Sequence, residues 1–171
     1  MKEILEKVSS YNIFNYLLPG IIFVVLAAKL THYNMIQQDL VIGAFVYYFV
    51  GLVASRFGSL VIEPFLKWIR FVRFAEYSQF VVASKIDPKI DILSEANNSY
   101  RTLCAMFVLL LLLKGFERLC TAFPPVSKWD LTMLLVLCFL MFLFAYKKQT
   151  AYITKRVDAS PKKANAAGEG L

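Results

Sequence analysis

The sequence is poor in the side chains that most enzymes use for catalysis. Its 171 residues include one histidine, His32, and three cysteines whose spacing fits no metal site. There is no glycine-rich phosphate loop, and no nucleophile lies at a usable spacing from a base. A single histidine leaves little room for general acid and base chemistry. We therefore expect a protein that is not an enzyme and that has no catalytic residues, metal or cofactor.

Charged residues are also scarce, and four long runs contain none. Only 18% of the residues are charged and 58% are hydrophobic, with a mean hydropathy of +0.57. An average soluble domain has about 25% charged and roughly 45–50% apolar residues. The uncharged runs cover residues 13–28, 40–55, 102–113 and 131–146. They predict four membrane spans, and a soluble bundle with an unusually apolar core is the less favoured alternative. The absence of charge in the runs counts against a proton-coupled transporter.

The basic residues are divided unequally between the two ends of these predicted spans. Four passes place both chain termini on one side, which then carries 15 of the 19 lysines and arginines. The other side holds only Lys29, Lys114, Arg118 and Lys128. Basic residues near span ends are retained in the cytoplasm, so both termini are predicted to be cytoplasmic. Anionic lipid headgroups account for the net charge of +7, and we expect no direct binding of nucleic acid.

Together these patterns predict an all-α fold, namely a four-helix transmembrane bundle with a cytoplasmic helical hairpin between spans 2 and 3. The predicted parts are an N-terminal interfacial segment (1–12), a first transmembrane hairpin (13–62), a cytoplasmic helical extension (63–101), a second transmembrane hairpin (102–148) and a cytoplasmic tail without regular structure (149–171).

The first span has an unusual entry, in which Asn12 and Asn15 precede the pair Pro19 and Gly20. Proline removes a backbone donor, and in lipid the carbonyl that loses its donor needs another partner. Asn12 or Asn15 could supply it. The sequence is consistent both with a kink or broken start near Pro19 and with a plain entry turn before a helix that begins there.

Small residues form a ridge along the second span. Gly51, Ser55 and Ser59 recur every fourth residue, and Ala54 and Gly58 flank them. This spacing lets two helices approach closely. We expect the ridge to pack on another helix, either of the same chain or of a second copy.

A basic and aromatic segment follows the second span. Pro64 marks an expected bend, after which Lys67, Arg70 and Arg73 recur every third residue among apolar side chains that include Trp68. The pattern predicts a basic amphipathic helix that lies on the membrane surface. A docking face for a cytosolic protein and an ordinary solvated helix face are the alternatives.

The third span is short. A helix that starts near Pro88 should run straight into it, yet only twelve residues separate Arg101 from Lys114. They span about 18 Å, against a hydrocarbon thickness of about 30 Å. Either protein shields the charged ends or the bilayer thins around them. Lys114, Glu117 and Arg118 share one helix face, so we expect them to pair with neighbours at the outer boundary.

Two stretches at the inner ends of the first and third spans carry a resemblance to a known family. They are residues 10–20, SYNIFNYLLPG, and residues 94–103, SEANNSYRTL, the second of which includes Asn97, Asn98, Tyr100 and Arg101. They resemble the four-span membrane subunit of the bacterial Kiwa anti-phage system, the KwaA-like family, with a similar layout over residues 8–146. The resemblance implies a multi-pass sensor and scaffold in the bacterial inner membrane. It also implies a homo-oligomer, with a tetramer suggested, that recruits a KwaB-like cytosolic DNA-binding effector subunit when phage attacks the envelope.

Two other classes of function stay open at this level. An oligomeric channel or membrane-perturbing effector would act by itself, and Ser55, Ser59 or Thr132 could line its pore, although no selectivity filter is recognisable. A lipid-binding structural protein without a partner is the third class. For the sensor and scaffold, the basic hairpin could hold the partner, and the short third span could make the bundle sensitive to bilayer thickness.

Overall fold

The computed structural model describes residues 13–158, and every regular element within this range is helical. In chain order the elements are the π-helical turn η1 (Ile13–Leu17), α2 (Leu18–Leu30), α3 (Leu40–Phe57), the second π-helical turn η2 (Gly58–Ile62), α4 (Glu63–Trp68), α5 (Tyr77–Ile86), α6 (Lys89–Ala122), α7 (Pro124–Ser127) and α8 (Asp130–Asp158). The predicted all-α class is thus confirmed for this part of the chain. The predicted interfacial segment with Asn12, and residues 159–171 of the predicted tail, lie outside the described residues.

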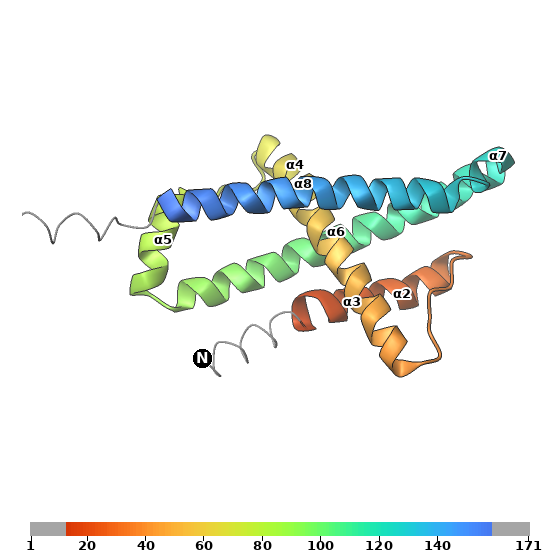
Figure 1. The fold of residues 1–171 in the computed structure, drawn as a ribbon, viewed down its shortest axis with the longest axis horizontal. Coiled ribbons are helices and arrows are strands. Elements are labelled where there is room, and N and C mark those ends of the chain that lie inside the picture. Colours follow the sequence, from red (N-terminus) through yellow and green to blue (C-terminus); the bar gives the residue numbers. More distant parts are fainter. Residues whose placement is uncertain (1–12, 159–171) are drawn as a thin grey trace, which may run out of the picture.

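Three long helices give the described part its shape. α6 and α8 run antiparallel along the long axis and are joined at one end by α7, while α3 crosses both of them (Figure 1). The loop between α2 and α3 lies at the same end as α7. α5 and the C-terminal end of α8 lie at the opposite end. The α2–α3 loop and α7 thus share one end of the molecule, and α5 lies at the other.

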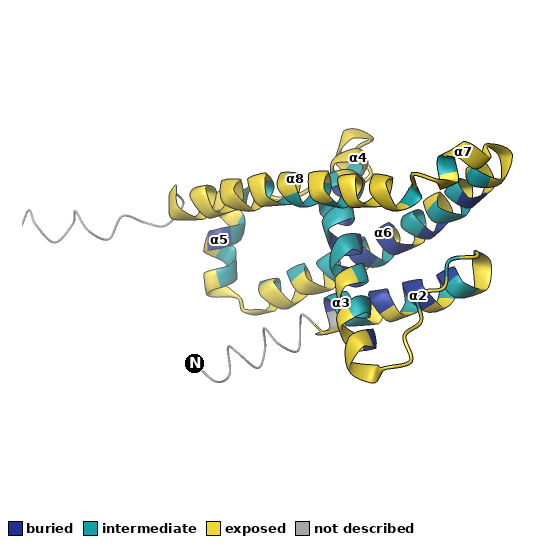
Figure 2. Ribbon diagram, turned by 45° about the vertical axis from the view of Figure 1, so that its right-hand side comes forward, coloured by how far each residue is buried: buried dark blue, intermediate teal, exposed yellow. Residues whose placement is uncertain are grey.

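The core lies between α2, α3 and α6. Its buried apolar side chains form one cluster, which consists of Phe23, Val24, Ala27, Ala54, Met106 and Leu110. α8 contributes no buried residue, and Figure 2 shows it exposed along most of its length. It is attached to the rest through a few contacts, one of which is the stack of Phe142 on Phe49, with ring centroids 6.0 Å apart. Three of the four predicted spans therefore build the core, and α8 lies beside it.

Two helical stretches are long and apolar enough to cross a membrane. They are Leu40–Trp68 and Asp130–Asp158, each of 29 residues, and Asn15–Leu30 is a shorter apolar helix. Only 22% and 6% of the most apolar windows of the two long stretches are buried. The core helix of a soluble protein would instead be mostly buried. An exposed apolar surface of this extent is typical of contact with lipid or with another protein.

The predicted ridge of small residues packs on other helices of the same chain. A Cβ atom at Gly51 would lie 1.7 Å from the carbonyl oxygen of Tyr16 in η1, and one at Gly58 would lie 3.1 Å from the Cβ of Ala105 in α6. Gly20 approaches α3 just as closely, since its Cβ would lie 1.7 Å from the carbonyl oxygen of Tyr47. Gly20 and Gly51 are required because backbone lies where a side chain would start, whereas at Gly58 the nearest atom is a side-chain carbon.

Each π-helical turn ends two residues before a proline. η1 precedes Pro19 and η2 precedes Pro64. The N–H of Glu63 donates to the carbonyl of Gly58, five residues back, instead of the usual four. The wider turn lets the helix continue past the proline, and so α3, η2 and α4 form one continuous helix through Pro64. At Pro19 the chain is helical on both sides, and the entry is a π-helical turn.

The predicted basic amphipathic helix after Pro64 is wrong beyond Trp68. Arg70 has a φ of 59°, in the left-handed region, and its N–H donates to the carbonyl of Lys67 at 3.0 Å. The N–H of Phe71 donates to the carbonyl of Leu66 at 2.9 Å. These two bonds form a Schellman motif, which ends a helix. Arg70 and Arg73 thus lie in the irregular segment 69–76, and they do not share a helix face with Lys67.

Two other boundaries can be compared with the predictions. α6 is one helix from Lys89 to Ala122, so the prediction of a helix that continues from the cytoplasmic extension into the third apolar run is confirmed. The prediction of a tail without regular structure from residue 149 is wrong up to Asp158, where α8 ends. The extra turns are anchored where Tyr152 contacts Tyr77 of α5, with ring centroids 6.3 Å apart.

Candidate functional site

A buried carboxylate joins three helices, α4, α6 and α8. Glu63 at the start of α4 is only 6% exposed. Its oxygens lie 2.8 Å from Nζ of Lys67, 2.7 Å from Nη1 of Arg101 in α6 and 3.7 Å from Nζ of Lys148 in α8. We call Ser59, Glu63, Lys67, Arg101 and Lys148 the inner polar cluster.

The charges of the inner polar cluster do not balance. Burial of an ionised carboxylate is costly unless cations beside it also donate hydrogen bonds to it. Glu63 meets this condition with Lys67 and Arg101, which both donate to it. One negative charge is nevertheless set against three positive ones. The cluster therefore stabilises the junction of three helices and keeps an excess of positive charge.

The geometry of η2 explains how α8 is attached to the cluster. In a regular helix the carbonyl of Ser59 would accept from the N–H of Glu63, but that N–H donates to Gly58 instead. The next possible donor would be residue 64, a proline, which has no N–H. Nζ of Lys148 takes the vacant place, 2.5 Å from the Ser59 carbonyl oxygen and 2.9 Å from its Oγ. The π-helical turn and Pro64 thus create an acceptor that a lysine of α8 uses.

The two stretches that carry the family resemblance meet in the fold. Ser99 Oγ in α6 donates to Oδ1 of Asn15 in η1 at 2.6 Å, and Asn15 is only 2% exposed. Two residues further along α6, Arg101 enters the inner polar cluster. The carbonyl of Asn98 accepts from Thr102 Oγ1 at 2.8 Å, whereas Asn97 and Tyr100 are exposed. The second stretch therefore places one side chain in each of two contacts between helices.

The residues predicted for lipid or partner docking divide into two groups. Lys67 is engaged within the chain, since it pairs with Glu63 and lies 4.2 Å from the ring centroid of Phe74. Trp68 is 79% exposed, and Arg70 and Arg73 are exposed in the segment that follows. The surface available for docking is thus Trp68, Arg70 and Arg73, without Lys67.

A second buried carboxylate lies near the C-terminal end of α6. Glu117 is buried, and it accepts from Nζ of Lys114 at 2.5 Å and from the backbone N–H of His32 at 2.6 Å. The hydrogen bond from Lys114 holds the pKa of Glu117 below its usual range, against the opposing effect of burial. The predicted pairing of Lys114 with Glu117 is confirmed. Arg118 is exposed and takes no part in that pair.

The role of Glu63 could not be read from local spacing, because Arg101 and Lys148 follow it by 38 and 85 residues. One signal was present in the sequence. Glu63 is the only acidic residue between Asp39 and Glu76, and it lies among several basic residues at the end of an apolar stretch. A lone carboxylate in such a position is expected to be paired.

The arrangement provides ion pairs and helix contacts. Within residues 13–158 no group of three or more His, Cys, Asp or Glu side chains is placed to hold a metal ion.

Comparisons with known proteins find no family model, no curated protein and no solved structure that matches the chain.

Proposed function

We propose that the chain is a four-span membrane protein with both termini in the cytoplasm. The observation that carries this placement is the sorting of charge along α6. Residues 102–113 are uncharged, and a buried carboxylate neutralises the basic residue at each end, Glu63 beside Arg101 and Glu117 beside Lys114. This sorting favours protein shielding of the short span over thinning of the bilayer.

We further propose that the protein acts as a sensor and scaffold subunit of a bacterial anti-phage complex, which holds a cytosolic effector at the inner membrane. The proposal follows from the family resemblance, and two structural features support it. The helices joined by the inner polar cluster form a connected unit, so a change in one span can reach the others. The docking surface of Trp68, Arg70 and Arg73 follows directly on this cluster and is exposed.

The alternative, an oligomeric channel or membrane-perturbing effector, is less well supported. Of the polar residues that could line a pore, Ser55 is buried and Ser59 accepts from Lys148. Both are therefore used inside one chain. Thr132 alone of the three is exposed.

The scaffold proposal is tested by purification of the protein in detergent together with the products of its neighbouring genes. The double variant Arg70→Glu and Arg73→Glu should recover about tenfold less partner, which corresponds to roughly 1.4 kcal/mol, because it reverses two exposed charges of the docking surface. Lys67 is kept, since Lys67→Glu would place a second carboxylate beside Glu63. The matched control reverses two exposed basic residues at the opposite end, Arg118 and Lys128.

Unchanged recovery of the partner in the double variant would argue against this docking surface. A protein that purifies alone and makes liposomes leak ions would contradict the scaffold and support the channel.

A further inference from the structure

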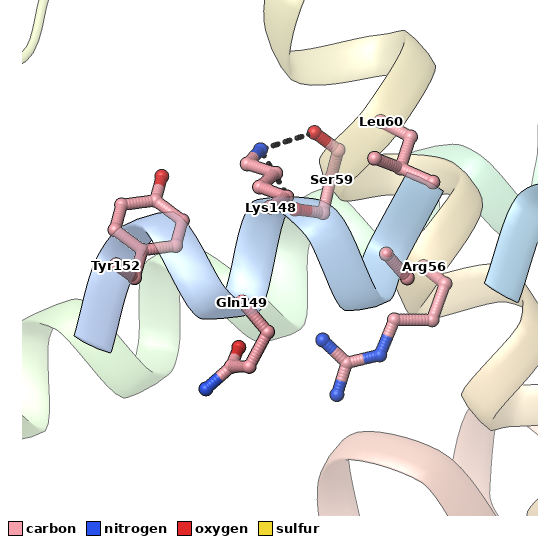
Figure 3. A pocket seen from close by; sticks show the side chains of 7 residues that line it. Arg56, Ser59, Leu60, Lys148, Gln149 and Tyr152 are labelled. Atoms are coloured by element: carbon pink, nitrogen blue, oxygen red, sulfur yellow. Dashed lines mark hydrogen bonds between the residues drawn. The ribbon is translucent and has the colours of Figure 1, made fainter. Parts of the chain in front are cut away.

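At the junction between α3, η2 and α8, two donor side chains have no partner within residues 13–158, and the positive charge is in excess. Arg56, Ser59, Lys148, Gln149 and Tyr152 are among the residues that line a small cavity there (Figure 3). No residue in the described part of the chain pairs with the guanidinium of Arg56 or with the side-chain amide of Gln149. Ser59 and Lys148, in contrast, satisfy each other.

These two donors line the same cavity. In Figure 3 the guanidinium of Arg56 and the amide of Gln149 lie on one side of α8, while the ammonium of Lys148 turns to the other side to reach Ser59. Arg56 is half-buried and Gln149 is exposed. A forked guanidinium beside a neutral amide donor is well suited to phosphate oxygens.

The size of the cavity defines how a ligand would fit. Its volume is about 20 Å³, which admits one water-sized group. A single phosphate oxygen can therefore enter, while the rest of the ligand stays outside the protein. A phospholipid headgroup, whose acyl chains remain in the membrane, could bind in this way.

The level of the cavity also points to the membrane surface. Arg56 directly follows the uncharged run 40–55, and Lys147 and Lys148 directly follow the run 131–146. The stacked rings of Phe49 and Phe142 lie six or seven residues earlier on the same helices, which is about 10 Å deeper along each axis. The cavity thus lies where two apolar surfaces end together.

We infer that this junction binds the phosphate of an anionic phospholipid in the inner leaflet, with Arg56 and Gln149 as donors and the excess charge of the inner polar cluster as the source of selectivity for a negative headgroup. The inference rests on the proposed membrane placement. A juxtamembrane arginine attracts anionic lipid by a free energy that corresponds to about a fivefold change in affinity.

The test measures the thermal unfolding midpoint of the delipidated protein in neutral detergent, with phosphatidylglycerol, phosphatidylcholine or inorganic phosphate added. Phosphatidylglycerol should raise the midpoint of the wild-type protein, and the other two additions should not. Arg56→Gln should need about fivefold more phosphatidylglycerol for half the effect. Arg56→Lys keeps the charge but loses the fork, and it should lie between these two proteins.

Arg118→Gln is the matched control, since it removes an exposed basic residue at the opposite end, and it should respond as the wild type does. Equal responses of Arg56→Gln and Arg118→Gln would overturn the site. An equal response of the wild type to inorganic phosphate would overturn the assignment to lipid. Release of the wild-type chain from membranes by alkaline carbonate would refute the membrane placement itself, whereas a retained chain without preference for phosphatidylglycerol refutes only this site.

Discussion

At the scale of single residues, Glu63 determines how the inner polar cluster is held together. It is the one negative charge among Lys67, Arg101 and Lys148, and it is more deeply buried than any of them. Removal of a buried partner leaves its counter-charges unpaired, which costs more than the pair itself contributes. Lys67 is almost half exposed, and its loss should matter much less.

Glu63→Gln should therefore destabilise the protein by about 3 kcal/mol, and Lys67→Gln by less than about 1 kcal/mol. Both values can be measured by unfolding in mixed detergent micelles. Glu95→Gln, the same change at an exposed position of α6, is the control and should have little effect. Equal losses for Glu63→Gln and Glu95→Gln would show that the cluster contributes little.

Arg70 is the residue at which the backbone is strained, because a side chain at φ 59° meets steric repulsion that glycine avoids. Arg70→Gly should stabilise the protein by about 0.5–1 kcal/mol, after the greater freedom of glycine in the unfolded chain is deducted. Arg73→Gly, in the same segment but without positive φ, should be neutral or destabilising. If both variants are destabilised to the same extent, the left-handed conformation of Arg70 carries no cost.

Single residues were predicted well where their partners are near in sequence. Lys114 and Glu117 are three residues apart on a helix, so their pairing follows from helical spacing alone. The partners of Glu63 come from α4, α6 and α8, and the spacing along one helix says nothing about them. Glu63 and Lys67 are four residues apart and their pairing follows the same helical spacing, yet Lys67 was predicted to dock lipid or a partner.

At the scale of elements, the fold depends on close contact between α2, α3 and the π-helical turn η1. Gly20 and Gly51 allow this contact, since a Cβ at either position would overlap a backbone carbonyl of the neighbouring element. Backbone atoms cannot move aside as a flexible side chain can. The whole helix would have to shift.

Gly51→Ala should thus destabilise the protein by roughly 2–3 kcal/mol, measured by the same unfolding titration. Gly115 provides a matched control in α6, because nothing lies within 4 Å of the position that its Cβ would occupy. Gly115→Ala should be stabilising by up to about 1 kcal/mol, through helix propensity. A stabilising effect of Gly51→Ala would contradict the close helix packing.

The sequence predicted elements where their limits have strong local signals. Asp87 and Pro88 mark the start of α6, and the small-residue ridge marks the packed face of α3 and η2. The end of α4 carries no glycine, and the arginine that adopts the left-handed conformation there gives no sign of it in the pattern. The π-helical turns were likewise missed. A proline indicates that the helix is irregular, but it does not indicate whether the irregularity is a kink, a break or a π-helical turn.

At the scale of the whole molecule, charge is gathered at two levels, and apolar surface lies between them. The inner polar cluster and the Glu117 pair lie toward opposite ends of α6. The four uncharged runs were evident from composition, but the weak attachment of α8 was not. A helix that is apolar all round gives no indication of which face packs on protein, so the sequence favoured a bundle of four equal helices.

The proposed four-span placement puts the inner polar cluster at the cytoplasmic face. The most direct measurement is labelling of single cysteines by a membrane-impermeant maleimide in spheroplasts, in a background that lacks the three native cysteines. Asn34→Cys in the α2–α3 loop and Ser127→Cys in α7 should react in intact spheroplasts. Glu76→Cys and Ser78→Cys, beside or within α5, should react only after the membrane is opened. Reaction of the α5 positions in intact spheroplasts, or equal reaction of all four, would contradict the placement.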